Sequence, residues 1–417
     1  MGYKERKLEK EIFKHFDIFP IVTITGPRQA GKSTLIKHII DAQWKYYSLD
    51  NRELLLRIND DPSLFSRTLD GHSAIDEAQK APELFHSLKL LVDTDYPYKI
   101  ILSGSANFLL MKSITESLAG RVGLLELLPF SLSEALQLKS NNFIKTITNT
   151  NDIKSLYKNI TLKENNNIDD NQLLLYILYG GYPKIYNLST HRGKWLWFQN
   201  YITTYLERDL RDLAQVANLD IFQRVYKLIA FHTGNIINMS TVAADVGVSV
   251  QTIKSYISLL QKSYQAILLP AYYFNQRKQI TKSPKIYYFD TGLVNYFMQN
   301  NTIEKMTHSP QWGSILESFV FSEFYKEIKD MVPKPSLYYW RTNNGAEVDF
   351  VIEHNDTLIP IEIKAGMHIK KQSIRGLKSF IESQKPGKIP FAVVLYRGEK
   401  TVYLEENILA IPLTLLF

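Results

Sequence analysis

The segment IFPIVTITGPRQAGKSTLIKHII, residues 18–40, contains the strongest structural signal in the sequence. Residues 18–25 form a short apolar run rich in β-branched side chains, which predicts a buried strand. The next eight residues fit the pattern G-x-x-x-x-G-K-[ST], and residues 34–40 have the spacing of a helix. A strand, a glycine-containing loop and a helix in this order predict a loop whose backbone N–H groups bind phosphate. A glycine-rich turn without a ligand is the alternative.

The same loop carries side chains suited to a nucleoside triphosphate with Mg²⁺. Lys32 would reach the β- and γ-phosphates, and the hydroxyl of Ser33 would bind the metal ion. The expected nucleotide-binding residues of the loop are Gly26, Pro27, Arg28, Gln29, Ala30, Gly31, Lys32, Ser33 and Thr34.

Two adjacent carboxylates follow at the end of the next short apolar stretch, in SAIDEAQ, residues 73–79. Asp76 would hold Mg²⁺ together with Ser33, and Glu77 would polarise the attacking water. Ser103, at the tip of a further apolar strand, would contact the γ-phosphate. The alternatives are a solvated helix start for the Asp-Glu pair and a helix cap by Ser105 at the second strand.

An amphipathic helix is expected over residues 107–119, followed by Gly120, Arg121 and a strand over residues 122–128. The order of the GPR loop, DEAQ, SGS and LAGR resembles prokaryotic AAA-type ATPases. The resemblance implies ATP as the nucleotide and a parallel sheet flanked by helices, a class that the alternation of helices and strands also predicts. It further implies a homo-oligomer in which Arg121 acts as a catalytic arginine finger on a neighbouring subunit's γ-phosphate. An arginine that only complements a helix dipole is the alternative.

The middle of the chain is predicted to be mostly helical. Residues 138–172 are polar and rich in Asn and Lys, which predicts a surface insertion with at most one or two helices. An apolar helix over residues 173–179 ends at GGYP, residues 180–183, a turn that also occurs in the resembled ATPases. The expected helix over residues 195–213 has an aromatic core face, and its charges are typical of a solvated or interdomain face. These charged residues, one of which contacts the nucleotide if the resemblance holds, are Glu207, Arg208, Asp209, Arg211 and Asp212.

Residues 240–260 have the form of a helix-turn-helix. The first helix ends at Gly247, and Ser249 caps the second. The side chains expected to face inward are Ile253, Ile257 and Leu260, and those expected to face outward are Gln251, Thr252, Lys254 and Ser255. Two strand-like segments flank a basic turn, Gln276 to Lys278, which predicts a winged helix. Its role stays open between DNA binding and contacts with protein.

The C-terminal third combines carboxylates and a lysine. A helix over residues 313–323 contains Glu317, and strands over residues 346–352 and 358–364 are predicted to form a hairpin. Glu362 and Lys364 project to one face of their strand, and Asp349 can point into the same cleft. Burying these groups unpaired would be costly, whereas carboxylate oxygens suit Mg²⁺.

This set resembles the PD-(D/E)XK nuclease superfamily, with Val-Asp in place of Pro-Asp. The resemblance implies a restriction-endonuclease-like α/β domain with Mg²⁺ or Mn²⁺ bound by Glu317, Asp349 and Glu362. It also implies catalytic roles for Glu362 and Lys364 at the attacking water and the developing phosphate charge. A nuclease-shaped but inactive module with a structural ion cluster is the alternative.

Composition limits the class of protein. With 417 residues, 45% of them hydrophobic and 22% charged, the chain is typical of soluble globular proteins and not of wholly disordered, collagen-like or coiled-coil chains. No run approaches the roughly 20 apolar residues of a membrane-spanning helix, and the lack of Cys excludes disulfide, zinc-thiolate and iron–sulfur sites. We therefore expect a cytoplasmic protein without a membrane partner. The net charge of +7 is compatible with nucleic acid but does not establish it.

The sequence thus predicts four parts: an ATPase core (1–135), a helical lid with the Asn-rich insertion (136–215), a winged helix (216–305) and a nuclease-like domain (306–417). The expected function is ATP binding and hydrolysis coupled to DNA binding or to metal-dependent DNA cleavage. One alternative is an ATP-dependent DNA-binding switch or remodeller whose nuclease-like domain does not cleave. The other is a signalling ATPase that binds only protein.

Overall fold

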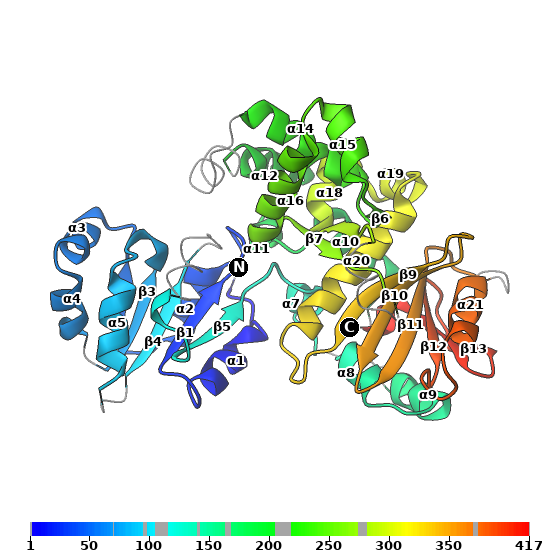
Figure 1. Ribbon diagram of the computed structural model, residues 1–417, viewed down its shortest axis with the longest axis horizontal. Helices are drawn as coiled ribbons and strands as arrows, with labels where there is room; N and C mark the ends of the chain where they lie inside the picture. The colour runs from blue at the N-terminus through cyan, green and yellow to red at the C-terminus, as the bar shows by residue number, and fades with distance from the viewer. Residues whose placement is uncertain are drawn as a thin grey trace.

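The computed structural model describes residues 2–69, 71–94, 98–104, 116–139, 142–162, 168–204, 218–273, 282–369 and 374–416. Figure 1 shows an α/β part at the N-terminal end, a largely helical central part and a second α/β part at the C-terminal end. Several sequence predictions fall outside the described residues. They concern Ser105, most of the helix expected over residues 107–119, the charges at 207–212 and the basic turn at 276–278.

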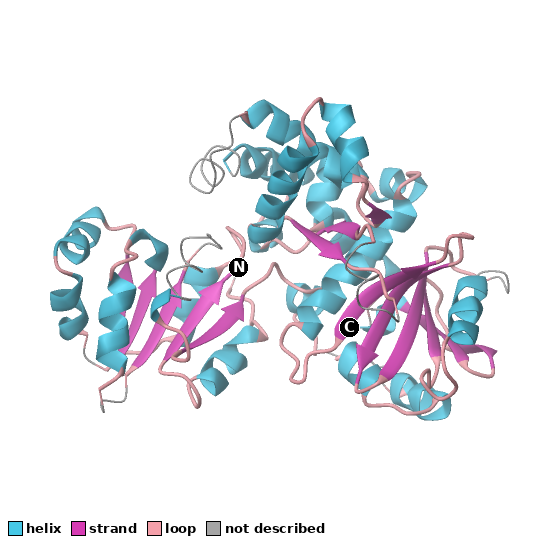
Figure 2. Cartoon of the chain, viewed as in Figure 1, coloured by secondary structure: helices cyan, strands magenta, loops and turns pink. Residues whose placement is uncertain are grey.

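The N-terminal part is a five-stranded parallel sheet in the order β2-β3-β4-β1-β5 (Figure 2). Its strands are β1 (Ile21–Thr25), β2 (Trp44–Ser48), β3 (His72–Asp76), β4 (Lys99–Ser103) and β5 (Val122–Glu126). Its helices are α1 (Leu8–His15), α2 (Lys32–Ile39), α3 (Arg52–Asp60), α4 (Pro62–Thr68), the 3-10 turn η1 (Ala78–Lys80) and α5 (Leu84–Val92). The parallel α/β core predicted from the sequence is therefore confirmed.

Alternate residues of the central strands supply the two faces of this sheet. Ile21 and Ile100 belong to one apolar cluster, and Val22 and Ile101 belong to another. The first strand is shorter than predicted, because Ile18 is 74% exposed and lies outside it. Since parallel strands share their carboxyl edge, the residues that follow β1, β3 and β4 meet at one side of the sheet.

The central part consists of helices and a small antiparallel sheet, β6-β8-β7. Its first helices are α7 (Leu132–Leu136), α8 (Phe143–Thr148), α9 (Ile153–Thr161), α10 (Asp170–Tyr179), α11 (Pro183–Tyr186) and α12 (His191–Thr204). There follow α14 (Leu219–Phe231), β6 (Asn235–Ile236), α15 (Met239–Val246), α16 (Val250–Lys262), β7 (Ala266–Leu269), β8 (Lys285–Tyr288), α18 (Thr291–Met298) and α19 (Ile303–His308). The Asn-rich segment contributes more than surface, because Phe143 and Leu156 of its helices are buried in the core.

The C-terminal part has a mixed sheet in the order β13-β14-β12-β11-β10-β9. Its elements are α20 (Trp312–Ile328), β9 (Ser336–Arg341), β10 (Glu347–His354), β11 (Thr357–Lys364), α21 (Arg375–Ser383), β12 (Ala392–Tyr396), β13 (Val402–Glu405), β14 (Ile408–Pro412) and η4 (Leu413–Leu416). The hairpin β10–β11 turns through Asn355 and Asp356, which both have positive φ, as a two-residue turn requires. Helices α20 and α21 cover opposite faces, because Phe319 and Phe380 belong to different apolar clusters.

One apolar cluster runs from Phe130 to Leu416 and includes residues of both the central and the C-terminal part. The clusters of the N-terminal part involve residues 3–127 and are separate from it. The central and C-terminal parts therefore share a core, and the four domain boundaries stay predictions. Within the described ranges, every helix is too short or too polar to cross a bilayer.

Candidate functional site

The loop between β1 and α2 can form only with glycine at two positions. Gly26 has φ +141°, and a Cβ there would lie 2.1 Å from the carbonyl oxygen of Leu127. Gly31 has φ +97° and precedes α2. These conformations are those that side chains disfavour, so the local sequence dictates the curl of the loop.

The Lys32 ammonium lies within this curl. It is buried and donates hydrogen bonds of 2.9 Å to the carbonyl oxygens of both Gly26 and Pro27. Gly31 has no side chain that could cap α2, and the first N–H groups of a helix then suit an anion. The loop therefore fits a phosphate group in both shape and charge. Gln29 and Thr34 are exposed at its rim, whereas Ala30 is fully buried.

Asp76 is the centre of a hydrogen-bond cluster at the carboxyl edge of the sheet. Its carboxylate accepts from the hydroxyls of Ser103, Ser33 and Tyr46, the last at 2.7 Å. Burial raises the pKa of Asp76, but these hydrogen bonds outweigh burial and hold the pKa below its ordinary value. The group is therefore ionised at neutral pH. A carboxylate beside the Ser33 hydroxyl and the phosphate loop fits Mg²⁺ in donor chemistry.

Glu77 follows directly and is half-buried, with φ +59°. Gln79 donates a 2.5 Å hydrogen bond to its carboxylate. The structure thus brings together Lys32, Ser33 and Asp76, with Glu77 next to them in the chain. Ser103 contacts Asp76 and is fully buried. Tyr46 was missed by sequence reasoning, because nothing in its strand distinguishes it from a packing residue.

Arg121 lies elsewhere. It precedes β5 and is therefore at the amino edge of the sheet, opposite the loop of its own chain. Its guanidinium forms a bidentate pair with Asp93, with N···O distances of 2.5 and 2.9 Å. The predicted finger role in a neighbouring subunit stays a prediction.

The C-terminal carboxylates surround a lysine that the sequence analysis missed. The Lys285 ammonium of β8 lies 2.8 Å from Glu317, 2.6 Å from Glu347 and 3.8 Å from Asp349. Its side chain is 2% exposed. Lys364 instead pairs with Glu362 at 2.6 Å, and the backbone N–H of Ile363 donates to Asp349. The available sequence signal for Lys285 was a single lysine at the start of the otherwise apolar strand KIYYF, residues 285–289.

Burial dominates the electrostatics of this cluster. It raises the pKa of Glu317 to about 7 and the pKa of Glu362 to about 8, and the charge of Asp349 adds to both effects. Across the described residues, no group of three His, Cys, Asp or Glu side chains is placed to hold a metal ion. The expected ligands Glu317, Asp349 and Glu362 therefore do not fit a divalent metal in this arrangement, because Lys285 pairs with Glu317 and lies 3.8 Å from Asp349, and Lys364 pairs with Glu362.

Among the described residues, Arg6, Pro183 and Tyr264 lie close to the nucleotide loop or to the strand before it. The buried guanidinium of Arg6 donates to the carbonyl of Ala30 at 3.0 Å and pairs with Glu134 of α7 at 3.2 Å. Pro183 of the GGYP turn lies 3.8 Å from the position of a Cβ on Gly31. Tyr264, which follows α16, donates to Glu126 at 2.8 Å, and its hydroxyl lies 3.3 Å from that of Thr25.

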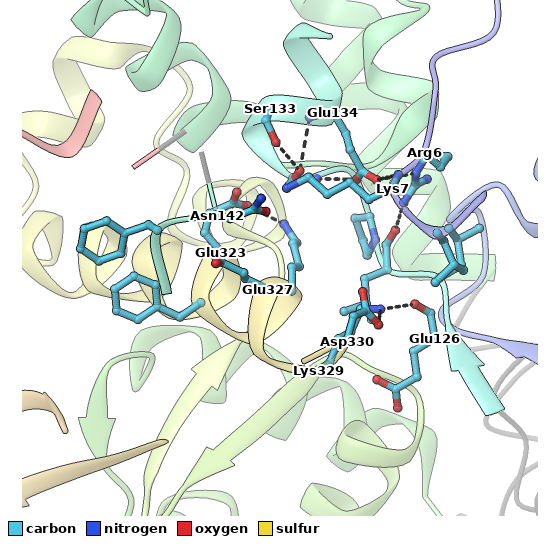
Figure 3. A pocket seen from close by; sticks show the side chains of 18 of the residues that line it. Arg6, Lys7, Glu126, Ser133, Glu134, Asn142, Glu323, Glu327, Lys329 and Asp330 are labelled. Atoms are coloured by element: carbon cyan, nitrogen blue, oxygen red, sulfur yellow. Dashed lines mark hydrogen bonds and ion pairs between the residues drawn. The ribbon is translucent and has the colours of Figure 1, made fainter. Parts of the chain in front are cut away.

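A small polar cavity of about 50 Å³ lies beside the first of these contacts. Figure 3 shows Arg6 and Glu134 at one side of it, and Lys329 with Glu126 at another. Lys329 donates to the carbonyl oxygen of Glu126 at 2.8 Å. The residue that directly follows α20, the helix that carries Glu317, thus contacts the end of β5 in the N-terminal sheet.

Comparisons with known proteins match three separate segments of the chain. Residues 19–136 match a family described as an AAA domain. Residues 170–304 and 312–416 match two families that are each described as a domain of unknown function, DUF8612 and DUF4143. The N-terminal sheet with its loop is therefore an AAA-type P-loop ATPase core, as the resemblance implied.

Relatives extend over most of the chain. An uncharacterized protein of Mycobacterium tuberculosis is 29% identical over 94% of this chain and 80% of its own length. An uncharacterized protein of Methanocaldococcus jannaschii is 24% identical over 91% of this chain and 82% of its own length. Among solved structures, a Walker-type ATPase of Pyrococcus abyssi is similar with a TM-score of 0.46 and 15% identity, over 71% of this chain and 96% of that one.

Proposed function

We propose that the protein is an ATP-dependent DNA-binding switch. It binds and hydrolyses Mg-ATP at the loop of residues 26–34, and the nucleotide state controls how the central and C-terminal parts engage DNA. The observation that carries the ATPase half is the cluster of Ser33, Asp76 and Ser103 beside the phosphate loop, at the carboxyl edge of a sheet that matches an AAA domain.

The loop, the residues beside it and Arg121 have separate roles in this proposal. The loop N–H groups and Lys32 bind the phosphates, which requires Lys32 to exchange its bonds to the Gly26 and Pro27 carbonyls for phosphate oxygens. Asp76, which is ionised at neutral pH, and Ser33 hold Mg²⁺. The bound ion neutralises charge on the phosphates. Glu77 orients and polarises the water, and Arg121 of a neighbouring copy contacts the γ-phosphate.

The coupling half of the proposal rests on the contacts of Arg6, Pro183 and Tyr264 with the loop and its strand. All three come from segments outside the sheet. A change in the loop on nucleotide binding would therefore act on α7, on the GGYP turn and on the end of α16.

The DNA half rests on the helix-turn-helix elements α15 and α16. Gly247 ends α15 in a left-handed conformation, and the Ser249 hydroxyl caps α16 by accepting from the Thr252 N–H. Side chains of α16 that are exposed include Gln251, Lys254 and Ser255. An exposed polar helix of this kind suits a DNA groove. DNA cleavage is left out of the proposal, because Lys285 occupies the acidic cluster.

Separate substitutions test binding and turnover. Lys32→Ala should weaken ATP binding at least about tenfold, because the loop loses its cation. Glu77→Gln should leave ATP affinity within about twofold and lower hydrolysis at least about hundredfold. Fluorescent ATP titration and phosphate release measure the two quantities.

Glu83→Gln is a matched control, since this exposed carboxylate precedes α5 and has no role in the proposal. Hydrolysis at the wild-type rate in the Glu77→Gln protein would refute the assignment of the base. DNA affinity that is identical with ATP, with ADP and without nucleotide would refute the switch. Absence of DNA binding in all three states would favour a signalling ATPase that binds only protein.

A further inference from the structure

We infer that the Lys285 ammonium is the resident cation of the C-terminal acidic cluster and excludes divalent metal from it. The cluster is defined by Glu317 of α20, Glu347 and Asp349 of β10, and Glu362 of β11. Removal of the Lys285 charge should convert the cluster into a site for Mn²⁺ or Mg²⁺. This inference concerns a different site from the ATP loop and does not depend on ATP hydrolysis.

The first argument is the position of the ammonium. Lys285 Nζ approaches carboxylates from two separate elements, Glu317 at 2.8 Å and Glu347 at 2.6 Å, with Asp349 at 3.8 Å. A side chain that is only 2% exposed cannot exchange these partners for water. The ammonium is therefore the counter-ion of the cluster and not a surface charge that happens to lie close.

The second argument is that the ammonium takes the carboxylates that a divalent ion would need. It lies 2.8 Å from Glu317 and 3.8 Å from Asp349. A divalent ion that shared the same carboxylates would lie within a few ångströms of this charge, and such repulsion is large in a buried site.

The third argument is an acceptor that the lysine leaves unfilled. The Oε2 atom of Glu362 is buried and has no hydrogen-bond partner among the described residues. Asp349 lies close by, because its carboxylate accepts a 2.7 Å hydrogen bond from the N–H of Ile363, the residue that follows Glu362. Buried carboxylate oxygens without partners are costly. A cation larger in charge than the ammonium could use this oxygen together with Asp349 and Glu317.

The fourth observation concerns which element carries the lysine. Lys285 begins β8, which pairs with β7, the strand that follows α16. Glu317, Asp349 and Glu362 belong instead to α20 and the C-terminal sheet. The cation and its carboxylates are thus supplied by different parts of the chain, and the same small sheet supports the helix-turn-helix and the lysine.

The test measures manganese binding in the full chain without nucleotide. Every protein, including the reference, carries Asp76→Asn, so that metal at the ATP site does not contribute. The compared proteins are the reference, the reference with Asp349→Asn, Lys285→Met, and Lys285→Met with Asp349→Asn. Free Mn²⁺ is counted by electron paramagnetic resonance, and thermal melting with and without Mn²⁺ is run in parallel.

We expect no Mn²⁺-dependent melting shift in the reference protein. Lys285→Met should bind Mn²⁺ at least about tenfold more tightly than the reference and should melt higher with the ion, because the ion binds only the folded state. Adding Asp349→Asn should remove both effects. Lys326→Met is the matched control, since Lys326 is a 10% exposed lysine that pairs with Glu323 on α20. It should gain no Mn²⁺ binding.

Two outcomes would overturn the inference. One is Mn²⁺ binding by the reference protein that Asp349→Asn abolishes, which would show that the lysine does not exclude metal. The other is a folded Lys285→Met protein that binds no Mn²⁺. If Lys285→Met does not fold, Lys285→Met with Glu347→Gln replaces it. The second change removes a carboxylate that has lost its lysine partner and keeps the three proposed metal ligands. Manganese binding by this double variant then decides in the same way.

Discussion

Single buried side chains hold the GGYP turn against the rest of the molecule, and Asp290 is the clearest case. Its carboxylate accepts hydrogen bonds from the backbone N–H groups of Gly181, Gly292 and Leu293, at 2.7, 3.0 and 3.2 Å. A Cβ on Gly180 would lie 2.1 Å from the same carboxylate, which explains the glycine. Asp290 thus joins a turn that touches the nucleotide loop to the start of α18.

This residue predicts a measurable pH dependence. Burial raises the pKa of Asp290 to about 6 against backbone hydrogen bonds and the Lys326 charge, which lower it. The carboxyl group of Asp290 therefore ionises at lower pH in the unfolded chain than in the folded chain. The contribution of this group to the free energy of unfolding, present near pH 4, is lost as the pH rises through about 6. A shift of about two units corresponds to about 3 kcal/mol.

Asp290→Asn removes this titration. We expect the free energy of unfolding of the wild type, minus that of Asp290→Asn, to fall by about 2 kcal/mol between pH 4 and pH 7, because Asp290 in the unfolded chain is already partly ionised at pH 4. Urea unfolding followed by tryptophan fluorescence at both pH values measures the difference. A difference that is constant or rises with pH would contradict the assigned direction.

At this scale, sequence spacing predicted some residues and necessarily missed others. Gly26, Lys32 and Ser33 were predictable because the residues of a phosphate loop lie close together in the sequence. Tyr46 contacts Asp76 from 30 positions away, and Arg6 pairs with Glu134 across 128 positions. Such pairs depend on the strand order and the packing of the chain, and the spacing of residues in the sequence predicts neither.

At the scale of elements, α16 connects the exposed face of the helix-turn-helix to the nucleotide loop. Its inward side chains Ile253, Ile257 and Leu260 are buried, as the periodicity predicted. Two residues beyond its end, Tyr264 has φ +58° and reaches Glu126 of β5 and Thr25 of β1. Thr25 is the residue immediately before the phosphate loop.

Removing the Tyr264 hydroxyl should therefore weaken the coupling between the nucleotide loop and the exposed face of α16. We expect Tyr264→Phe to keep ATP affinity and hydrolysis within about twofold, because the hydroxyl touches neither phosphate-binding nor catalytic residues. The ratio of the DNA affinity with ATP to that with ADP should shrink by roughly five- to tenfold. A change of this size corresponds to a typical coupling free energy between two sites. Fluorescence anisotropy of labelled duplex DNA measures this ratio.

Tyr256→Phe is the control for this prediction. Tyr256 lies on α16 itself, but its hydroxyl contacts the carbonyl of Asn218 and not the N-terminal sheet. Its affinity ratio should stay that of the wild type. An unchanged ratio in Tyr264→Phe would remove this tyrosine from the coupling path.

Helices and strands were predictable where their ends have their own chemistry. Gly247 and Ser249 mark the helix-turn-helix, and Asn355 and Asp356 mark the hairpin between β10 and β11. The position of β8 against α20 has no such local signature. The strand pattern thus led to an expected acidic site of Glu317, Asp349 and Glu362, whereas nothing in the sequence indicated that Lys285 would pair with Glu317.

At the scale of the whole molecule, the N-terminal core and the rest have separate apolar clusters, and polar contacts of Arg6, Tyr264 and Lys329 join them. Such a division lets one body move relative to another at little cost in packing. The two edges of the N-terminal sheet also differ in role. The loop and Asp76 lie at the carboxyl edge, whereas Arg121 lies at the amino edge and pairs with Asp93.

This geometry predicts that hydrolysis needs two copies of the chain. Arg121 is on the wrong edge to reach its own loop, so a finger role requires a neighbour's nucleotide. Arg121→Ala and Glu77→Gln should each be inactive alone. Mixed, they should recover roughly a quarter of the wild-type rate, because a quarter of randomly formed interfaces combine an intact Glu77 with an intact Arg121. Asp93→Asn should not lower hydrolysis, since it only releases the exposed guanidinium of Arg121.

Phosphate release from the mixture, with light scattering to show that the copies assemble, measures the recovery. A mixture that assembles and stays inactive, or an Arg121→Ala protein that hydrolyses ATP alone, would exclude the finger role and leave Arg121 as the partner of Asp93.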